Sequence, residues 1–230
     1  MPQRRTIDLG GTNCYLIGDD EGFVLIDTGL PHSRAQLLET LDKAGCHPAD
    51  LRLIVLTHGD IDHSGNAAYL RGRFGAPIAM HSGDTAMCLS DGETRERDAR
   101  PPDDFPKVLY LWLVASVFRY FARKLLRREA FEPFSPDILL SDGEDLRQYG
   151  LAAIAYHTPG HSKGSISLLT PGGDLYCGDH FAQVWGHVIG ARDDSDFPST
   201  SDKLRALRIR MVYPGHGEPF SPDRTKLWLA

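Results

Sequence analysis

Cysteine is sparse in this chain of 230 residues, and no basic excess or long apolar run stands out. Its four cysteines form no Cys-x-x-Cys pair, which argues against a disulfide-stapled domain and favours a reducing compartment. A formal net charge of −6 gives no electrostatic reason to expect nucleic acid as a partner. No apolar leader-like segment precedes the first strand-like run, so we expect a cytoplasmic protein.

The remaining composition is that of a globular domain, with 41% hydrophobic and 24% charged residues. Short aliphatic runs bounded by turn residues predict strands, and longer amphipathic segments predict helices. The expected strands are 13–18, 23–29, 51–58, 76–81, 137–140, 151–161, the hairpin 164–180 and 211–217, and the expected helices are 33–45, 64–75 and 201–210. We therefore predict one α/β domain over 1–230, with two mixed sheets face to face and helices outside.

One segment departs from this alternation, and we expect it to be a helical insertion at about 91–134. Residues 91–106 are polar and rich in proline, and residues 107–128 are apolar with interspersed arginines. A helix there has three roles open to it: a lid with Tyr110, Trp112 and Phe118 lining an apolar pocket, a contact with a second copy or a membrane surface, or core packing. Its unbroken apolar part, 108–115, is far shorter than the roughly 20 residues that span a bilayer.

The stretch LTHGDIDHSGN, residues 56–66, places two imidazoles and two carboxylates at the end of an expected buried strand. These side chains are His58, Asp60, Asp62 and His63. Neutral imidazole and carboxylate are ligands for zinc and similar divalent ions. The local spacing predicts a metal site that takes further ligands from elsewhere in the chain.

Three more metal-binding side chains occur in the same setting, each in a glycine-containing turn after a strand-like run. His161 lies in TPGHSKGS, Asp179 in YCGDH and His216 in YPGHGEP. Glycine beside a ligand lets the backbone turn sharply, and strand ends are where open α/β sheets place their sites. These positions support one site assembled from several loops.

The order and spacing of these motifs resemble those of the metallo-β-lactamase superfamily, with GGTNCYLIG and FVLIDTG preceding them. The resemblance implies an αβ/βα four-layer sandwich with the site along one edge of the sheets. It also implies two divalent metal ions per chain, with zinc favoured. By resemblance, site one would take His58, Asp60 and His161, site two would take Asp62, His63 and His216, and Asp179 would bridge them.

Position 60 is where the chain departs from the family pattern His-x-His-x-Asp-His, because Asp60 replaces the second histidine. Three outcomes are open. In the first, Asp60 is a ligand, and its carboxylate, a harder donor than imidazole, would then admit iron or manganese at site one. Alternatively, site one binds metal weakly beside a single ion at site two, or the whole site is vestigial. We favour a ligating Asp60, since the other six positions are intact. The flavo-diiron branch of the family also carries a carboxylate there.

Several nearby polar residues have structural explanations. Asp27, in DTG, is expected to accept hydrogen bonds and hold the metal loop from behind the ligands. His180 and His187 follow Asp179 closely and are weaker candidates for a supporting or substrate-side role. Lys163 is expected to be a solvated turn lysine, although it could reach a substrate carboxylate.

The resemblance and the metal chemistry together predict a metal-dependent hydrolase. A metal pair lowers the pKa of a bound water to about 7, so that hydroxide can attack an ester, lactone, thioester or related bond. Asp62 is the residue expected to orient that water or move its proton. Two alternatives stay open: a non-haem iron oxidoreductase, suggested by Asp60, and a non-catalytic binding protein that kept the fold.

Overall fold

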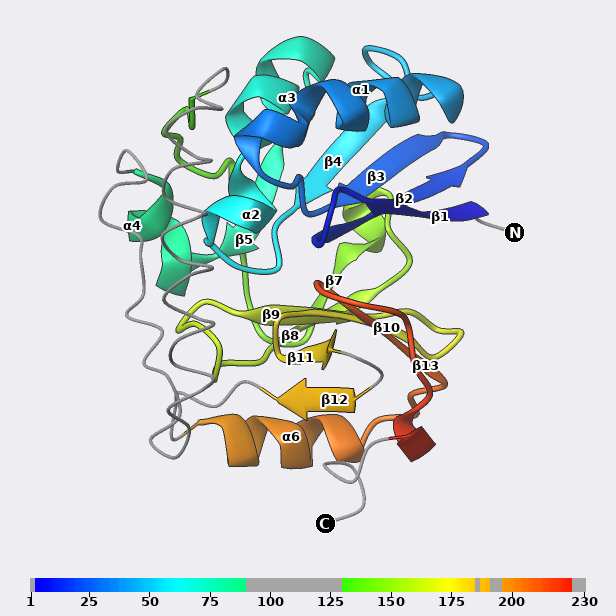
Figure 1. Cartoon of the computed structure of the whole chain (residues 1–230), viewed down its shortest axis with the longest axis vertical. Coiled ribbons are helices and arrows are strands. Elements are labelled where there is room, and N and C mark those ends of the chain that lie inside the picture. Colours follow the sequence, from blue (N-terminus) through cyan, green and yellow to red (C-terminus); the bar gives the residue numbers. More distant parts are fainter. Residues whose placement is uncertain (1–2, 90–129, 185–186, 191–195, 225–230) are drawn as a thin grey trace, which may run out of the picture.

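The computed structural model describes residues 3–89, 130–184, 187–190 and 196–224. In Figure 1 these residues form layers, with helices outside and two β-sheets facing each other between them. The predicted αβ/βα sandwich of mixed sheets is confirmed.

The first sheet contains six of the described strands in the order of the sequence. They are β1 (Gln3–Asp8), β2 (Asn13–Asp19), β3 (Gly22–Ile26), β4 (Leu51–Val55), β5 (Ile78–His81) and β6 (Ile138–Leu140). The pairs from β1 to β3 are antiparallel, and those from β3 to β6 are parallel. Parallel neighbours need crossovers, and between β3 and β5 these crossovers contain helices.

The second sheet has five described strands in the order β13-β10-β9-β8-β7. They are β7 (Glu144–Asp145), β8 (Ile154–His157), β9 (Ile166–Leu169), β10 (Asp174–Gly178) and β13 (Met211–Pro214). A separate hairpin, β11 (Phe181–Val184) with β12 (His187–Gly190), lies between this sheet and the helix beneath it (Figure 1). The parallel pair β10–β13 ends in the two loops that carry Asp179 and His216.

Helices cover the outer faces of both sheets. The described α-helices are α1 (Arg34–Lys43), α2 (Ile61–Ser64), α3 (Ala67–Phe74), α4 (Thr85–Cys88) and α6 (Phe197–Arg205). In Figure 1, α1 and α3 cover the first sheet, and α6 lies on the side of the second. Helix α3 ends at Gly75, whose left-handed φ of 74° stops the helix as predicted.

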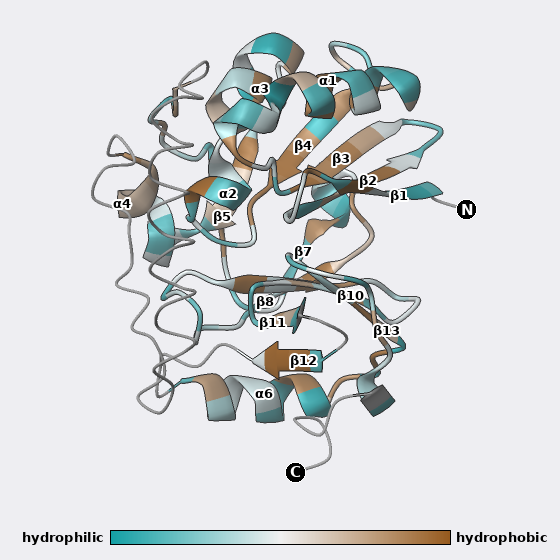
Figure 2. Cartoon of the chain, in the orientation of Figure 1, coloured by the Kyte–Doolittle hydropathy of each residue, from teal (hydrophilic) through white to brown (hydrophobic). Residues whose placement is uncertain are grey.

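The period-two alternation of strand side chains explains how one strand contacts two cores. On β4, Leu53 and Val55 belong to the core between the sheets, whereas Ile54 packs under α1 and α3. All three are fully buried. Hydrophobic residues accordingly colour the central strands in Figure 2, while the outward helix faces are mostly hydrophilic. Because both faces of β4 are buried, the strand is held firmly in the core, and so is the start of the loop that follows it.

The structure corrects several details of the sequence-based prediction. Strand β1 was not predicted, because its sequence QRRTID is polar and only Ile7 on it is buried. Ser33 precedes α1, but its hydroxyl bonds Leu9 O (3.4 Å) and does not cap the helix. Helix α6 begins at Phe197, four residues before the predicted start at 201.

The predicted helical insertion falls mostly outside the described residues, since 90–129 are not among them. Its described end, 130–134, is irregular, with Phe134 buried against the core below α3. Among the helices that the structure describes, none is long and apolar enough to cross a membrane.

Candidate metal centre

The first ligand loop follows β4 directly and begins with His58. His58 is 1% exposed, so the strand end delivers its imidazole into the interior. Asp60 occupies the N-cap position of α2, where its backbone carbonyl accepts from His63 N (3.0 Å) and Ser64 N (2.8 Å). The Asp60 carboxylate makes no capping bond to that helix, so it is available to the site.

The distant ligand loops converge on the same point, as the sequence predicted. His161 follows β8, Asp179 follows β10 and His216 follows β13. Gly215 N donates to Gly178 O (2.8 Å), which ties the last two loops together. A side chain at Gly215 would collide with Asp179 Oδ1 and His63 Cε1, so glycine is required at that position.

Three side chains form one group around a common point, which we name the site-one group: His58, Asp60 and His161. Their nearest ligand atoms all lie within 4.8 Å of one another. Asp60 Oδ2 is 2.9 Å from His161 Nε2 and 3.5 Å from His58 Nε2. Asp60 Oδ2 therefore lies beside both imidazoles of the group.

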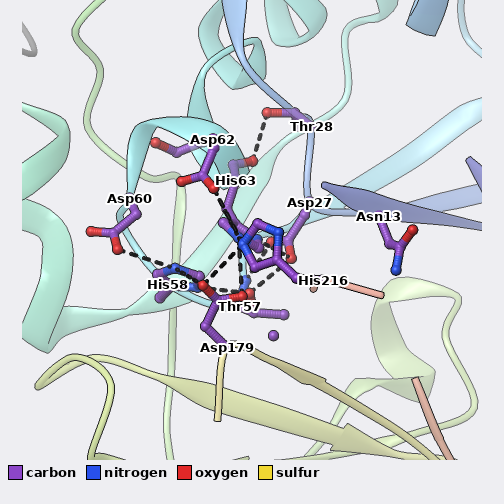
Figure 3. A network of polar contacts seen from close by, with 12 residues as sticks. Asn13, Asp27, Thr28, Thr57, His58, Asp60, Asp62, His63, Asp179 and His216 are labelled. Carbon is purple, nitrogen blue, oxygen red and sulfur yellow. Dashed lines mark hydrogen bonds and ion pairs between the residues drawn. The ribbon is translucent and has the colours of Figure 1, made fainter. Parts of the chain in front are cut away.

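A second group, the site-two group, consists of Asp62, His63 and His216. Its ligand atoms also lie within 4.8 Å of one another. Asp62 Oδ2 is 3.3 Å from His216 Nε2, and the two imidazoles approach to 3.5 Å between their Nε2 atoms. Figure 3 shows these side chains pointing toward one another.

Asp179 lies between the two groups. Asp179 Oδ2 is 3.2 Å from His216 Nε2 and 3.7 Å from His161 Nε2, and Asp179 Oδ1 is 3.2 Å from His63 Nε2. The structure thus brings together all seven side chains predicted from the sequence.

Asp27 holds the first loop from behind, as predicted. It is 1% exposed and has a left-handed φ of 60°, and its Oδ1 accepts from Thr57 N (2.8 Å). Its Oδ2 accepts from Thr57 Oγ1 (2.8 Å) and from His63 Nδ1 (2.9 Å). Because the Thr57 hydroxyl donates to Asp27, it accepts from His58 Nδ1 (3.0 Å). One carboxylate therefore orients an imidazole in each group (Figure 3).

His216 is oriented by the backbone, since its Nδ1 lies 2.6 Å from Gly11 O. Asn13 Nδ2 supports the same loop by donating to Pro214 O (3.1 Å) and Gly217 O (2.6 Å). With Nδ1 carrying the proton in His58, His63 and His216, each neutral imidazole turns an Nε2 lone pair into the site. A fixed tautomer of this kind is typical of metal-ligating histidines.

The residues present fit a divalent cation. His58 Nε2 and Asp179 Oδ1 are buried and make no hydrogen bond. Buried polar atoms almost always have a partner, so these two atoms indicate a group that the side chains themselves do not supply. Four imidazoles and three carboxylates are also the donor types that zinc and iron accept.

The electrostatics of the metal-free chain point the same way. Burial alone would favour the neutral form of His63, but Asp179 and Asp27 raise its pKa well above the usual value. Burial likewise opposes the charge on His216, yet Asp179 and Asp62 raise its pKa to about 10. Despite burial, the facing imidazoles lower the pKa of Asp60 and Asp179. The carboxylates stay ionised and attract positive charge to this point.

The weaker candidates lie apart from the ligand atoms. His180 is fully buried, stacks on Phe197 with ring centroids 4.7 Å apart, and its Nε2 lies 3.3 Å from Ser201 Oγ. Burial lowers the pKa of His180 to about 3, so it is a neutral packing residue beside α6. His187 and Lys163 are exposed.

Sequence reasoning missed three supporting residues: Thr57, Asn13 and Asp84. Thr57 immediately precedes His58, and Asp84 follows the end of β5, so both occur at strand ends like the ligands. Their roles are hydrogen bonds to loops distant in sequence, which motif spacing does not reveal. Strand-end position is the one signal that could have found Thr57 and Asp84.

Comparisons with known proteins agree with this geometry. The chain is 30% identical over 208 residues to Metallo-beta-lactamase domain-containing protein 1 of Xenopus laevis, covering 86% of this chain and 67% of that protein. It is 25% identical over 217 residues to an atrochrysone carboxyl ACP thioesterase of Aspergillus fumigatus, covering 92% of this chain but only 52% of that protein. A solved metallo-beta-lactamase family protein from Thermus thermophilus superposes with a TM-score of 0.67 at 25% identity, covering 98% of this chain and 76% of that one.

A family model described as the metallo-beta-lactamase superfamily matches residues 7–216, a span that contains all seven clustered side chains. Fold, motif order and this match agree. The chain belongs to the metallo-beta-lactamase superfamily.

Proposed function

We propose that this protein is a metal-dependent hydrolase that cleaves an ester, lactone or thioester bond of a small molecule. The observation that carries the proposal is the convergence of seven imidazole and carboxylate side chains, with two buried ligand atoms lacking any hydrogen bond. His58, Asp60 and His161 would hold one divalent ion, Asp62, His63 and His216 a second, and Asp179 would contact both. Bound divalent ions would supply a water activated near neutral pH and would polarise the substrate oxygen.

Asp62 is the residue that we assign to proton movement. Its side chain is 30% exposed, whereas the neighbouring His63 is fully buried, so solvent can reach the Asp62 carboxylate. Burial tends to raise its pKa, but His216 and His63 lower it overall, so the carboxylate is ionised at neutral pH. An ionised carboxylate can accept the proton of the attacking water and return it to the leaving oxygen or sulfur.

Membership of the metallo-beta-lactamase superfamily and the net negative charge of the chain support a carbonyl substrate. Attack of water at a carbonyl carbon breaks the bond to oxygen or sulfur and releases a carboxylic acid with an alcohol or thiol. The net charge of −6 disfavours a polyanionic nucleic acid. The thioesterase from Aspergillus fumigatus that this chain resembles supports including thioesters among the substrates tested.

The test is an activity screen of the full chain against ester, lactone, thioester, β-lactam and phosphodiester substrates. We expect hydrolysis of a carbonyl substrate that is lost with a chelator and restored by zinc. Asp62→Ala should lower kcat by about 100-fold or more, the range of a lost acid–base group. The matched control is Asp42→Ala, at a side chain that is 77% exposed on α1.

Full activity in Asp62→Ala would contradict the proton role. Activity that survives complete removal of divalent metal would contradict the hydrolytic mechanism as a whole. A folded chain that binds metal but hydrolyses none of these substrates would favour the non-catalytic alternative.

A second candidate, an iron oxidoreductase, is favoured by one observation. Asp60 places a carboxylate 2.9 Å from His161, which makes the site-one group harder than three imidazoles would. Two results together would support this candidate over the hydrolase. The purified chain would contain two irons and little zinc, and it would reduce dioxygen when an electron donor is supplied.

A further inference from the structure

We infer that Asp84 is the positioning residue of the site-one group, because its buried carboxylate ties together the two loops that carry His58, Asp60 and His161. This inference rests on the proposed function, since it assigns a structural cause to metal binding at one of the two groups. Asp84 is not a ligand and lies behind the ligand loops.

Asp84 is placed by the end of β5. The 3-10 turn Ser82–Asp84 follows that strand directly, and Asp84 is 1% exposed. It occupies the N-cap position of α4, yet its side chain makes no capping bond to that helix. A buried carboxylate that does not cap its own helix needs other donors to offset the cost of burial.

Those donors come from both ligand loops. Asp84 Oδ2 accepts from Gly59 N (2.9 Å), and Gly59 lies between His58 and Asp60. The same oxygen accepts from Ser162 Oγ (2.6 Å), and Asp84 Oδ1 accepts from Gly164 N (2.7 Å). Ser162 directly follows His161, so one carboxylate connects loops that are about a hundred residues apart.

Asp84 and the two ligand loops pack so closely that a side chain at any of three glycines between them would force its neighbours to move. A Cβ at Gly164 would lie 2.6 Å from Asp84 Cγ, and one at Gly59 would lie 3.1 Å from Asp84 Cβ. A Cβ at Gly83 would lie 2.9 Å from Gly164 Cα. Three glycines therefore let the two ligand loops approach the carboxylate, and the carboxylate in turn fixes their separation.

The site-two group is held by different contacts. Asp27 binds His63 directly, and Gly11 O binds the Nδ1 of His216. Neither contact passes through Asp84. A change at Asp84 should therefore weaken the site-one group and spare the site-two group.

Asp84→Asn isolates this role because it preserves shape but replaces one acceptor oxygen with an NH₂ donor. Gly59, Ser162 and Gly164 can no longer all donate to it. Loss of such supporting hydrogen bonds lowers metal affinity by about 10- to 100-fold in other metal sites. The matched control is Asp137→Asn, whose carboxylate accepts from Ile78 N (2.9 Å) and from Arg71, away from the ligand loops.

The experiment titrates the metal-free 230-residue chain with zinc by calorimetry in two mutant backgrounds. In His216→Ala, which breaks the site-two group, adding Asp84→Asn should weaken the remaining ion by about 10- to 100-fold. In His161→Ala, which breaks the site-one group, adding Asp84→Asn should leave the remaining affinity unchanged. Equal weakening in both backgrounds, or no weakening in either, would overturn the inference.

Hydrogen exchange of the metal-free protein gives a readout that needs no ion. Amides in 57–60 and 160–164 should exchange faster in Asp84→Asn, and unchanged exchange would overturn the inference even if zinc did not bind. Absence of zinc binding by the wild-type chain would instead contradict the proposed function. If Asp84→Asn does not fold, Ser162→Ala, which removes one of the three bonds, should shift both readouts in the same direction by less.

Discussion

Histidines of this site have their tautomers set by neighbours outside the ligand positions. His63 Nδ1 is fixed by Asp27, His58 Nδ1 by the Thr57 hydroxyl and His216 Nδ1 by Gly11 O. Each Nε2 is thereby left to face the site. The ligand side chains lose their conformational freedom when the chain folds, so metal binding does not have to order them.

Asp27→Asn should weaken metal binding because its Nδ2 cannot accept a hydrogen bond from His63 or Thr57. We expect zinc affinity to fall by about 10- to 100-fold, measured by competition with a chromophoric chelator. Thr57→Val removes the hydroxyl that links Asp27 to His58 but keeps the bonds of Asp27 to Thr57 N and His63, so it should produce a smaller loss. Equal affinity in Asp27→Asn and wild type would contradict this assignment.

Asp60→His gives the sequence His-x-His-x-Asp-His over residues 58–63 and should change which ion the chain prefers. An imidazole is a softer donor than a carboxylate, so the ratio of zinc to iron and manganese in the purified protein should rise. Elemental analysis of protein expressed in medium containing all three metals measures that ratio. Asp202→His, an exposed change on α6, is the control, and an unchanged ratio would remove the main support for a ligating Asp60.

At the scale of elements, β4 matters most because both of its faces are buried and its end carries the first ligand loop. Leu53→Ala should reduce the free energy of unfolding by about 2–5 kcal/mol, measured by urea denaturation of metal-free protein. The matched control is Leu139→Ala on β6, where the side chain is 57% exposed. Its effect should stay within about 0.5 kcal/mol. Similar losses in both variants would show that β4 is not part of the central core.

Elements with a clear hydrophobic pattern could be predicted from the sequence, and elements held by distant partners could not. Strands β4 and β5 are short runs of mostly apolar residues, and Gly75 marks the end of α3. Strand β1 is a polar edge strand that exists through pairing with β2, so no local pattern reveals it. All seven clustered side chains could be found from motif order, but Asp84 could not, because its hydrogen bonds depend on tertiary contacts.

At the scale of the whole molecule, seven ionisable groups share one small volume, so stability without metal should depend on pH. The raised pKa of His216, about 10, means that the folded metal-free chain binds this proton more tightly than the unfolded chain. That contribution is complete below the unfolded pKa of about 6.5 and is lost as pH rises toward 10. His63 acts in the same direction.

We therefore expect the Tm of the metal-free protein to fall between about pH 6.5 and 10, measured by calorimetry, and to fall less steeply in His216→Asn. With zinc bound, the trend should weaken or reverse, because ligand imidazoles must be neutral to bind metal. A metal-free protein whose Tm rises across this window would contradict the charge balance described for the site.

The central claim is that one edge of the two sheets assembles two divalent-ion sites from His58, Asp60, Asp62, His63, His161, Asp179 and His216. Native mass spectrometry of the zinc-titrated chain tests it most directly. We predict a mass increase of two zinc ions per chain, reduced to one in His161→Ala. A wild-type chain that takes up no zinc or a single ion at saturation would contradict it.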